Sequence, residues 1–345
     1  MKFPSTGRIQ SGLTVGILAF LACPPSQARE IYWAETNSDA VFGASVVDGA
    51  DQRKIRDLDE TGRGSRSYFI NEIAVFDNLL FITAPGDDRI FYTTTTTPNL
   101  SGLFVNLDRE FNTNQNIDYR PVGITANSEH VYWTDSNTRK IYRADFGIAL
   151  GGRGAEELID LPGDDPRPQS ITVFGNDLYW VLEGRDEIYR SDLEGNNVSR
   201  IISLDSTFGD GSYIPNAITA TDRHIYWSDI ETDTIYRADR DGSNAIPLID
   251  TGDDPSDGPV GLTTDGLFLY WTTFLDNDIF AATLDGQLES SERFTPDPDP
   301  NETGPDFSIN TLAIAYVPEP ASLTLLITAA AVLSLRRRRD ESCDD

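Results

Sequence analysis

Residues 130–145 read His-Val-Tyr-Trp-Thr-Asp-Ser-Asn-Thr-Arg-Lys-Ile-Tyr-Arg-Ala-Asp. Two runs rich in β-branched and aromatic residues flank a polar, turn-forming segment, a pattern that predicts two strands joined by a short loop. The aromatic pair in the first run returns at intervals of 44 to 51 residues, as Tyr32-Trp33, a degenerate Phe81-Ile82, Tyr132-Trp133, Tyr179-Trp180, Tyr226-Trp227 and Tyr270-Trp271. This period indicates one supersecondary unit that is repeated six times.

Each repeat contains strands on both sides of this hairpin. A turn with glycine follows it in most copies, as at Glu194-Gly195 and Asp241-Gly242, and marks a third strand, because glycine accepts the positive φ angles of tight turns. Small apolar residues such as 121–125 precede the aromatic pair and suit a crowded inner strand. Four strands in each of six repeats predict an all-β fold, a six-bladed β-propeller over residues 29–316.

The two ends of the repeat array complement each other. The first aromatic pair has no inner-strand motif before it, whereas residues 309–316 supply that motif alone after the sixth repeat. We therefore expect residues 309–316 to pair with the strand at Ile31–Trp33, so that the first blade is shared between the two ends and the ring is closed.

The repeats resemble the YWTD repeats of the low-density-lipoprotein-receptor class. Tyr132-Trp-Thr-Asp135 and Tyr226-Trp-Ser-Asp229, with Ile141-Tyr-Arg-Ala-Asp145 and Ile235-Tyr-Arg-Ala-Asp239, carry the resemblance over roughly residues 30 to 316. It implies that the repeat tryptophans, of which Trp33 is the first, pack between blades and that the motif aspartates and following arginines lock neighbouring blades together. These roles fall to Trp133, Trp180, Trp227, Trp271, Asp135, Asp229, Arg143, Arg190 and Arg237. The first two repeats depart from the pattern, with Ala34-Glu35 and Thr83-Ala84 in place of Thr-Asp.

Residues 1–28 have the composition of a secretory signal peptide. A basic start is followed by an apolar stretch from Leu13 to Ala22 and by small residues at Ser26-Gln27-Ala28. The apolar stretch is shorter than the ~20 residues of a membrane-spanning helix, which disfavours an anchor. Cys23 suggests a lipoprotein alternative, but Phe20-Leu21-Ala22 before it match that signal poorly.

Residues 317–345 form a three-part tail. Pro318, Glu319 and Pro320 precede an apolar segment, 321–335, which predicts a transmembrane helix, and Arg336, Arg337, Arg338 and Arg339 follow it. The arginines would hold that end on the cytoplasmic side. The tail resembles a PEP-CTERM sorting signal, which implies transient membrane insertion, processing by an exosortase-type membrane protease of Gram-negative bacteria, and a mature protein at the cell surface or outside the cell.

The composition limits the classes of partner. The formal net charge of −29 argues against nucleic acid, which is bound by clustered lysine and arginine. Such a charge favours solubility outside the cell and attraction to cations or basic surfaces. Both cysteines lie in the two terminal segments, so we expect no disulfide in the propeller.

No catalytic motif stands out. His130 and His224 occupy equivalent positions in two repeats, which favours a structural role, and the chain has no nucleophile elbow, zinc-protease motif or phosphate loop. The best candidates for binding are acidic loops that we expect on one propeller face together with Asp135, Asp186, Asp229, Asp233 and Asp278. Two interpretations remain open for these loops: a calcium site or a solvated acidic rim. The candidate cation ligands are Asp164, Asp165, Asp253, Asp254 and Asp257.

Export, a receptor-like scaffold and the lack of a catalytic motif favour one function. We expect a non-enzymatic surface or matrix protein that binds a protein or polysaccharide with a propeller face and needs no cofactor, calcium being the candidate exception. The alternative is a propeller enzyme, a lyase or hydrolase, with a metal-assisted acidic site at the central channel.

Overall fold

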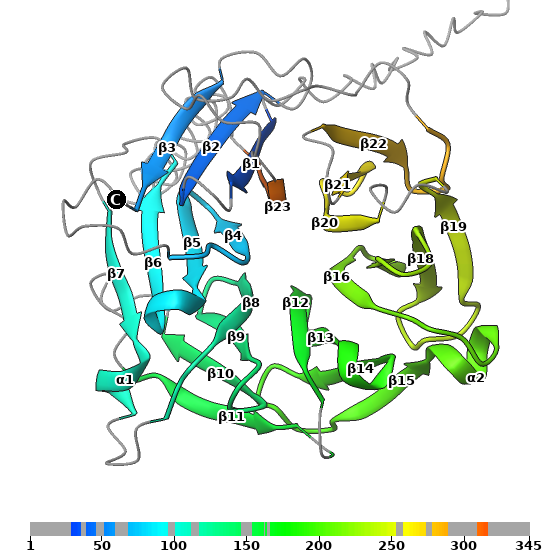
Figure 1. Ribbon diagram of the computed structural model, residues 1–345, viewed down its shortest axis with the longest axis horizontal. Coiled ribbons are helices and arrows are strands. Elements are labelled where there is room, and N and C mark those ends of the chain that lie inside the picture. The colour runs from blue at the N-terminus through cyan, green and yellow to red at the C-terminus, as the bar shows by residue number, and fades with distance from the viewer. Residues whose placement is uncertain are drawn as a thin grey trace, which may run out of the picture.

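Six antiparallel sheets surround a central axis (Figure 1), as the sequence predicts. The computed structural model describes residues 29–35, 39–45, 52–58, 68–95, 101–111, 117–145, 154–161, 163, 166–252, 258–273, 278–288 and 309–316. The predicted signal peptide, the sorting tail and the hydrophobic helices expected at both chain ends lie outside these residues. Within them, no helix has the length and apolar character needed to cross a membrane.

The blades follow one another in chain order, and each runs from an inner strand to an outer strand. Blade 1 contains β23 (Ile309–Tyr316), β1 (Arg29–Glu35), β2 (Ala40–Ser45) and β3 (Arg53–Asp57). Blade 2 contains β4 (Ile73–Phe76), β5 (Leu79–Ala84), β6 (Arg89–Thr94) and β7 (Ser101–Asn106). Blade 3 contains β8 (Pro121–Ala126), β9 (His130–Asp135), β10 (Lys140–Asp145) and β11 (Glu156–Asp160).

The remaining blades repeat this arrangement. Blade 4 contains β12 (Pro168–Phe174), β13 (Asp177–Leu182), β14 (Glu187–Asp192) and β15 (Ser199–Ser203). Blade 5 contains β16 (Pro215–Ala220), β17 (His224–Asp229), β18 (Thr234–Asp239) and β19 (Ile246–Asp250). Blade 6 contains β20 (Pro259–Thr264), β21 (Phe268–Thr273) and β22 (Ile279–Thr283), and a bridge from Ala282 to Leu288 begins its outer edge within the described residues.

The predicted ring closure is confirmed. Strand β23 pairs antiparallel with β1, so that Ile31 lies opposite Ile314 and Trp33 opposite Leu312. The last described strand is therefore the innermost strand of the first blade, and strand pairing joins the two ends of the propeller.

In every repeat a further aromatic residue follows ten positions after the first member of the aromatic pair, and this spacing has a simple structural cause. In the β9–β10 hairpin, Trp133 lies directly opposite Tyr142, and the two rings stack with centroids 5.7 Å apart and planes 11° apart. Equivalent stacks form in four other blades, between Trp33 and Phe42, Trp180 and Tyr189, Trp227 and Tyr236, and Trp271 and Phe280. Cross-strand pairs of this kind fix the hairpin register, because a one-residue slip would separate the rings.

The core consists of six apolar clusters, one between each pair of adjacent blades. Successive side chains of a strand point to opposite faces of its sheet. The buried Trp133 accordingly packs in a cluster with blade 2 residues such as Phe81, whereas its neighbour Tyr132 packs with Trp180 of blade 4. Each aromatic pair thus contributes to two interfaces, which explains why both of its members are large and buried.

Candidate functional site

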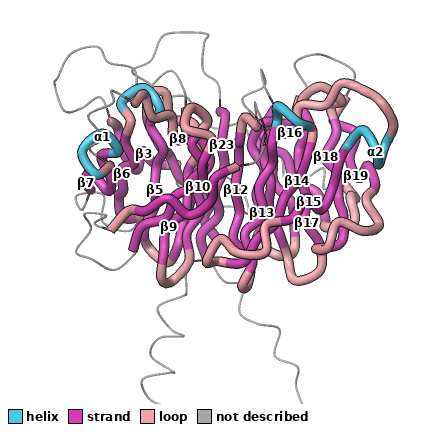
Figure 2. Tube along the Cα trace, turned by 90° about the horizontal axis from the view of Figure 1, so that it is seen from below, coloured by secondary structure: helices cyan, strands magenta, loops and turns pink. Residues whose placement is uncertain are grey.

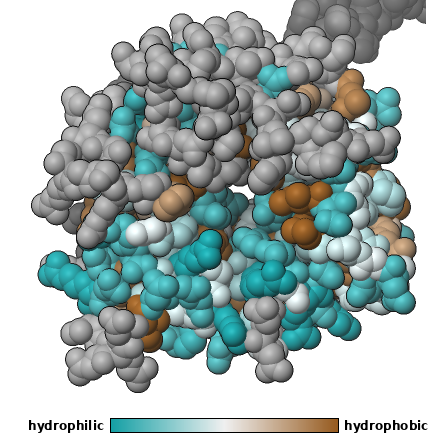
Figure 3. All heavy atoms as spheres, in the orientation of Figure 1, coloured by the Kyte–Doolittle hydropathy of each residue, from teal (hydrophilic) through white to brown (hydrophobic). Residues whose placement is uncertain are grey.

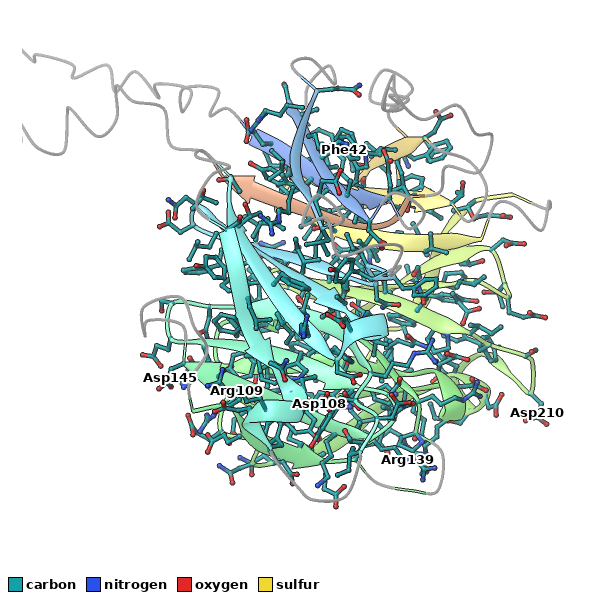
Figure 4. The ribbon with its side chains drawn as sticks, turned by 60° about the vertical axis from the view of Figure 1, so that its left-hand side comes forward. Phe42, Asp108, Arg109, Arg139, Asp145 and Asp210 are labelled. Carbon is teal, nitrogen blue, oxygen red and sulfur yellow. The ribbon has the colours of Figure 1, made fainter. Side chains whose placement is uncertain are left out.

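Four short helices identify one face of the ring. They are η2 (Pro85–Asp87), α1 (Leu107–Glu110), η3 (Glu183–Arg185) and α2 (Leu204–Phe208). All four lie along the same edge of the molecule in Figure 2, and we call this side the helical face. The loops that join β9 to β10 and β17 to β18 emerge on it as well. In Figure 4, Arg139 and Asp210 lie on this side, at the right, and Asp145 lies on the opposite side.

Carboxylates crowd together on the helical face. Burial and the nearby charges of Asp108, Asp118 and Asp135 raise the pKa of Asp88 to about 6. Burial and Asp205 likewise raise the pKa of Asp186. Hydrophilic residues predominate among those coloured on this face in Figure 3.

The opposite face behaves differently. There, hydrogen bonds from Ser243 lower the pKa of Asp241, and a hydrogen bond from Thr283 lowers that of Asp285. The described carboxyl groups whose pKa is raised by burial and by neighbouring carboxylates, Asp88, Asp186 and Asp229, lie on the helical face.

The motif aspartates hold a hairpin loop against the start of their own blade. The buried Asp135 accepts hydrogen bonds from the backbone N–H of Arg120 at 2.7 Å and from the backbone N–H of Thr138 at 2.8 Å. Asp229 makes the equivalent bonds to Ile214 and Thr232. The resemblance implied contacts between neighbouring blades, whereas these bonds lie within one blade. Burial raises the pKa of Asp229 to about 6 despite these bonds.

The arginines after the second aromatic lie at the outer part of the opposite face. Arg143 pairs with Glu156 of its own blade and with Glu194 of the next, at 2.7 and 2.8 Å. Arg237 donates to the carbonyl of Leu284 in the next blade. Arg190 pairs with Asp177 inside blade 4, and Asp177 in turn accepts from Arg240 of blade 5. All three arginines thus belong to contacts that reach a neighbouring blade, directly or through Asp177.

The third motif position carries an inter-blade role that the sequence analysis missed. The Thr134 hydroxyl accepts from the N–H of Gly123 at 2.8 Å and donates to the carbonyl of Gln169 in the next blade at 2.6 Å. Thr83, in the repeat that departs from the pattern, donates to the carbonyl of Val122 in the same way. The recurrence of Thr or Ser after the tryptophan was the available signal.

The central channel contains a cavity of about 110 Å³ lined by all six inner strands, β4, β8, β12, β16, β20 and β23. These strands surround the centre of the ring in Figure 1. Each inner strand pairs on one side only, so its other edge presents backbone N–H and C=O groups to the channel. The cavity is therefore suited to water or to a small polar group.

Glu72 is the ionisable residue in the wall of this cavity. Its Oε1 accepts from the Ser170 hydroxyl of blade 4 at 2.6 Å, and its Oε2 accepts from the N–H of Ile124 in blade 3 at 2.8 Å. The side chain keeps some exposure to the channel, but protein surrounds it and no ion pair to a described residue compensates its charge. Burial consequently raises the pKa of Glu72 to about 8.

Glu72 also breaks the repeat. In blade 2, Ile73 lies opposite Ile82, the second member of the aromatic pair, and Glu72 comes directly before Ile73. The equivalent position holds a small residue in the other blades. Those residues are Gly123, Ser170, Ala217, Gly261 and Thr311. A comparison of the inner-strand motifs could have identified Glu72, because it introduces an acid where the other copies have small residues.

The two histidines lie at strand starts on the opposite face. His130 is 3.5 Å from Asp145, and His224 is 3.5 Å from Asp239, in each case the residue directly across the hairpin. Burial and Arg237 lower the pKa of His224. The pairs lie in separate blades, and the structure brings neither histidine to the channel cavity.

The candidate cation ligands Asp164, Asp165, Asp253, Asp254 and Asp257 lie outside the described residues, so a calcium site in these loops stays a prediction. Among the residues that the structure does describe, no group of three His, Cys, Asp or Glu side chains is placed to hold a metal ion.

Comparisons with known proteins support the fold. No protein-family model and no curated protein sequence matches the chain. Among solved structures, a YWTD-type propeller in the crystal structure of a nidogen/laminin complex is similar with a TM-score of 0.64 and 17% identity, over 83% of this chain and 98% of that one. Virginiamycin B lyase from Staphylococcus aureus is similar with a TM-score of 0.54 and 17% identity, over 78% of this chain and 81% of its own. A streptogramin B lyase is similar with a TM-score of 0.57 and 16% identity, over 78% and 80%.

Proposed function

We propose that this chain is an exported surface or matrix protein that binds a protein or polysaccharide partner with its helical face. The crowding of Asp88, Asp108, Asp118 and Asp135 carries the proposal. Carboxylates that repel one another reduce stability, and a cationic partner would relieve the repulsion and be steered toward the face. The similarity to a propeller from a nidogen/laminin complex is compatible with a binding role.

Capture of partners from the producing cell's surface fraction tests this proposal. The immobilised propeller should retain one or more components, and the double variant D88N/D108N should retain at least several-fold less. The matched control is E129Q/D222N, which removes the same charge from exposed positions on the opposite face. Equal capture by both variants would show that the helical face is not the binding surface.

Export belongs to the same proposal and rests on the two terminal segments. A signal peptide at residues 1–28 and a tail with Pro318, Glu319, Pro320 and the arginines 336–339 would bring the propeller through the inner membrane to an exosortase-type protease. The mass of the protein recovered from the cell exterior should correspond to loss of both segments. A recovered mass that retains residues 321–335 would contradict processing of the tail.

The second candidate function is a lyase or hydrolase with a metal-assisted acidic site in the channel. Glu72 beside a polar cavity favours it, and two lyases are among the proteins of similar fold. Metal analysis of the purified protein separates the two functions. A stoichiometric ion that is lost in E72Q would support the enzyme. An ion that is retained in E72Q would instead be bound away from the channel, as in the acidic loops.

A further inference from the structure

We infer that the helical end of the central channel is a seat for an aliphatic ammonium group, such as a lysine side chain of a partner or a free amine, with Glu72 as its carboxylate and Phe69 as an aromatic contact at the mouth. The inference rests on the proposed binding function and names the chemical group that the face would recognise. Three observations that do not depend on one another lead to it.

The first observation is the free acceptor capacity of Glu72. A carboxylate offers about four lone-pair sites, and Glu72 uses one on each oxygen, for Ser170 and for Ile124. Burial raises the pKa of Glu72 to about 8, because no cation compensates the ionised form, and a bound ammonium group would favour that form. An ammonium group brings both the missing charge and three N–H donors. The cavity of about 110 Å³ has room for such a group and its nearest methylenes.

The second observation is the conformation of Phe69. Its side chain is 56% exposed, and its backbone has a φ of 50°, which is unfavourable for a bulky residue. The flanking Tyr68 and Ile70 are buried, and the Tyr68 N–H donates to Asp39 while its carbonyl accepts from Gly86 of η2. The fold therefore fixes both neighbours and presents the aromatic ring to solvent.

Phe69 and Glu72 lie on the same segment, which leads from the helical face into the inner strand β4. Glu72 is the third residue after Phe69, so their Cα atoms are at most roughly 11 Å apart. The bond from Gly86 to Tyr68 places this segment beside η2, on the helical face. A cation held by a carboxylate gains further attraction from an aromatic ring within about 6 Å of it.

The third observation is the sign of the surrounding charge. Asp88 and its acidic neighbours lie on this same face, and their field attracts cations toward the channel mouth. A metal ion could also bind to the carboxylates, but calcium prefers six to eight oxygen ligands, and a phenyl ring supplies none. The ammonium group accounts for Glu72, Phe69 and the acidic field together.

The test is a calorimetric titration of the purified propeller with Nα-acetyl-lysine-N-methylamide. Nα-acetyl-norleucine-N-methylamide serves as the neutral analogue. We expect saturable binding of the lysine compound and at least tenfold weaker binding of the norleucine compound. E72Q should weaken lysine binding at least tenfold, and F69A, a change at an exposed position, should weaken it several-fold. E129Q makes the same Glu-to-Gln change at an exposed position on the opposite face and should leave binding unchanged.

Further ligands distinguish a free amine from a protein side chain as the source of the ammonium group. Equal affinity for n-butylamine would indicate a free amine, and tighter binding of the lysine compound would indicate a protein side chain. Binding that is equal for norleucine, or undiminished in both E72Q and F69A, would overturn the inference, as would E72Q-sensitive binding of calcium chloride without any binding of amines. If amines fail to bind while surface-fraction capture still depends on Asp88 and Asp108, the inference fails and the proposed function stands.

Discussion

At the residue scale, small polar groups decide how adjacent blades are joined. The Thr134 hydroxyl satisfies one backbone N–H of its own blade and one carbonyl of the next. Thr83 repeats the inter-blade bond although its repeat lacks the motif aspartate, so the loss of Asp does not remove this connection. A buried hydroxyl with two backbone partners is costly to lose, because both partners are left without a hydrogen bond.

Replacing Thr134 with Val should destabilise the propeller by about 1–3 kcal/mol, because the Gly123 N–H and the Gln169 carbonyl lose their partner. Valine fits the position sterically, since Val181 is the equivalent buried residue of blade 4. The measurement is denaturant unfolding of the purified propeller. Thr134→Ser keeps the hydroxyl, so its free energy of unfolding should be much closer to that of the wild type. An equal loss of stability in both variants would show that packing is the cause.

The raised pKa of Glu72 predicts that the stability of the fold depends on pH. Burial raises its pKa from the ordinary 4.5 to about 8 in the fold, so the folded state binds the proton more tightly than the unfolded state. The resulting stabilisation is fully present below about pH 4.5 and is lost as the pH rises toward 8, at ~1.4 kcal/mol per pH unit. In E72Q, the free energy of unfolding should change less between pH 4.5 and 8 than it does in the wild type. Identical slopes in both proteins would show that Glu72 ionises freely in the channel.

At the scale of the element, the outer hairpin turns of blades 4, 5 and 6 pack each of these blades against the preceding one. Gly242 has a φ of 86°, and a Cβ built on it would lie 2.2 Å from the carbonyl oxygen of Ile201 in blade 4. Gly195 and Gly286 lie in equivalent turns and approach Leu158 and Leu248 in the same way. Glycine is needed there both for the conformation and for the close approach of two backbones.

Alanine substitutions at Gly242 and Gly266 separate the effect of the backbone conformation from that of the close backbone approach. Gly266 has a similar φ of 84°, but a Cβ there meets nothing within 4 Å. G266A should therefore cost only the strain of a left-handed residue, roughly 1 kcal/mol. G242A should cost clearly more, because blades 4 and 5 must also move apart. Thermal unfolding of both variants makes the comparison, and equal melting temperatures would show that the inter-blade approach is easily relieved.

At the scale of the whole molecule, stability depends on the closed ring. Strand β23 covers one edge of β1 and contributes Ile309 and Leu312 to the cluster that contains Trp33 and Tyr270. The same strand lines the channel with the five other inner strands. Its loss would expose an unpaired strand edge and two inter-blade interfaces at once.

Truncation before Ile309 should abolish cooperative unfolding and increase binding of a hydrophobic dye, whereas truncation after Tyr316 should leave the unfolding midpoint within error of the full propeller. Circular dichroism and dye fluorescence on the purified proteins provide the readouts. A stable, cooperative protein without residues 309–316 would show that pairing with β1 is not what closes the ring.

The repeating pattern alone determined the number of blades, the hairpin in each repeat and the pairing of residues 309–316 with β1. These features could be predicted because each depends on local periodicity, on turn residues or on an inner strand missing from one end and present at the other. The division of the core into six inter-blade clusters follows from the same alternation of side chains. The resemblance implied that Asp135 locks neighbouring blades together, whereas its partners Arg120 and Thr138 belong to its own blade and depend on how a loop folds back onto it.

Tertiary structure alone decided where the candidate site lies. The bonds of Glu72 reach 52 and 98 residues along the chain, and they form only because the ring brings three inner strands around one channel. Its desolvation, the exposure of Phe69 and the mutual repulsion of Asp88 with Asp108, Asp118 and Asp135 are likewise consequences of closure. Local sequence determines which strands form, because hydrogen-bonding geometry and side-chain alternation are short-range, whereas burial and electrostatic interaction depend on the residues that the closed ring brings together.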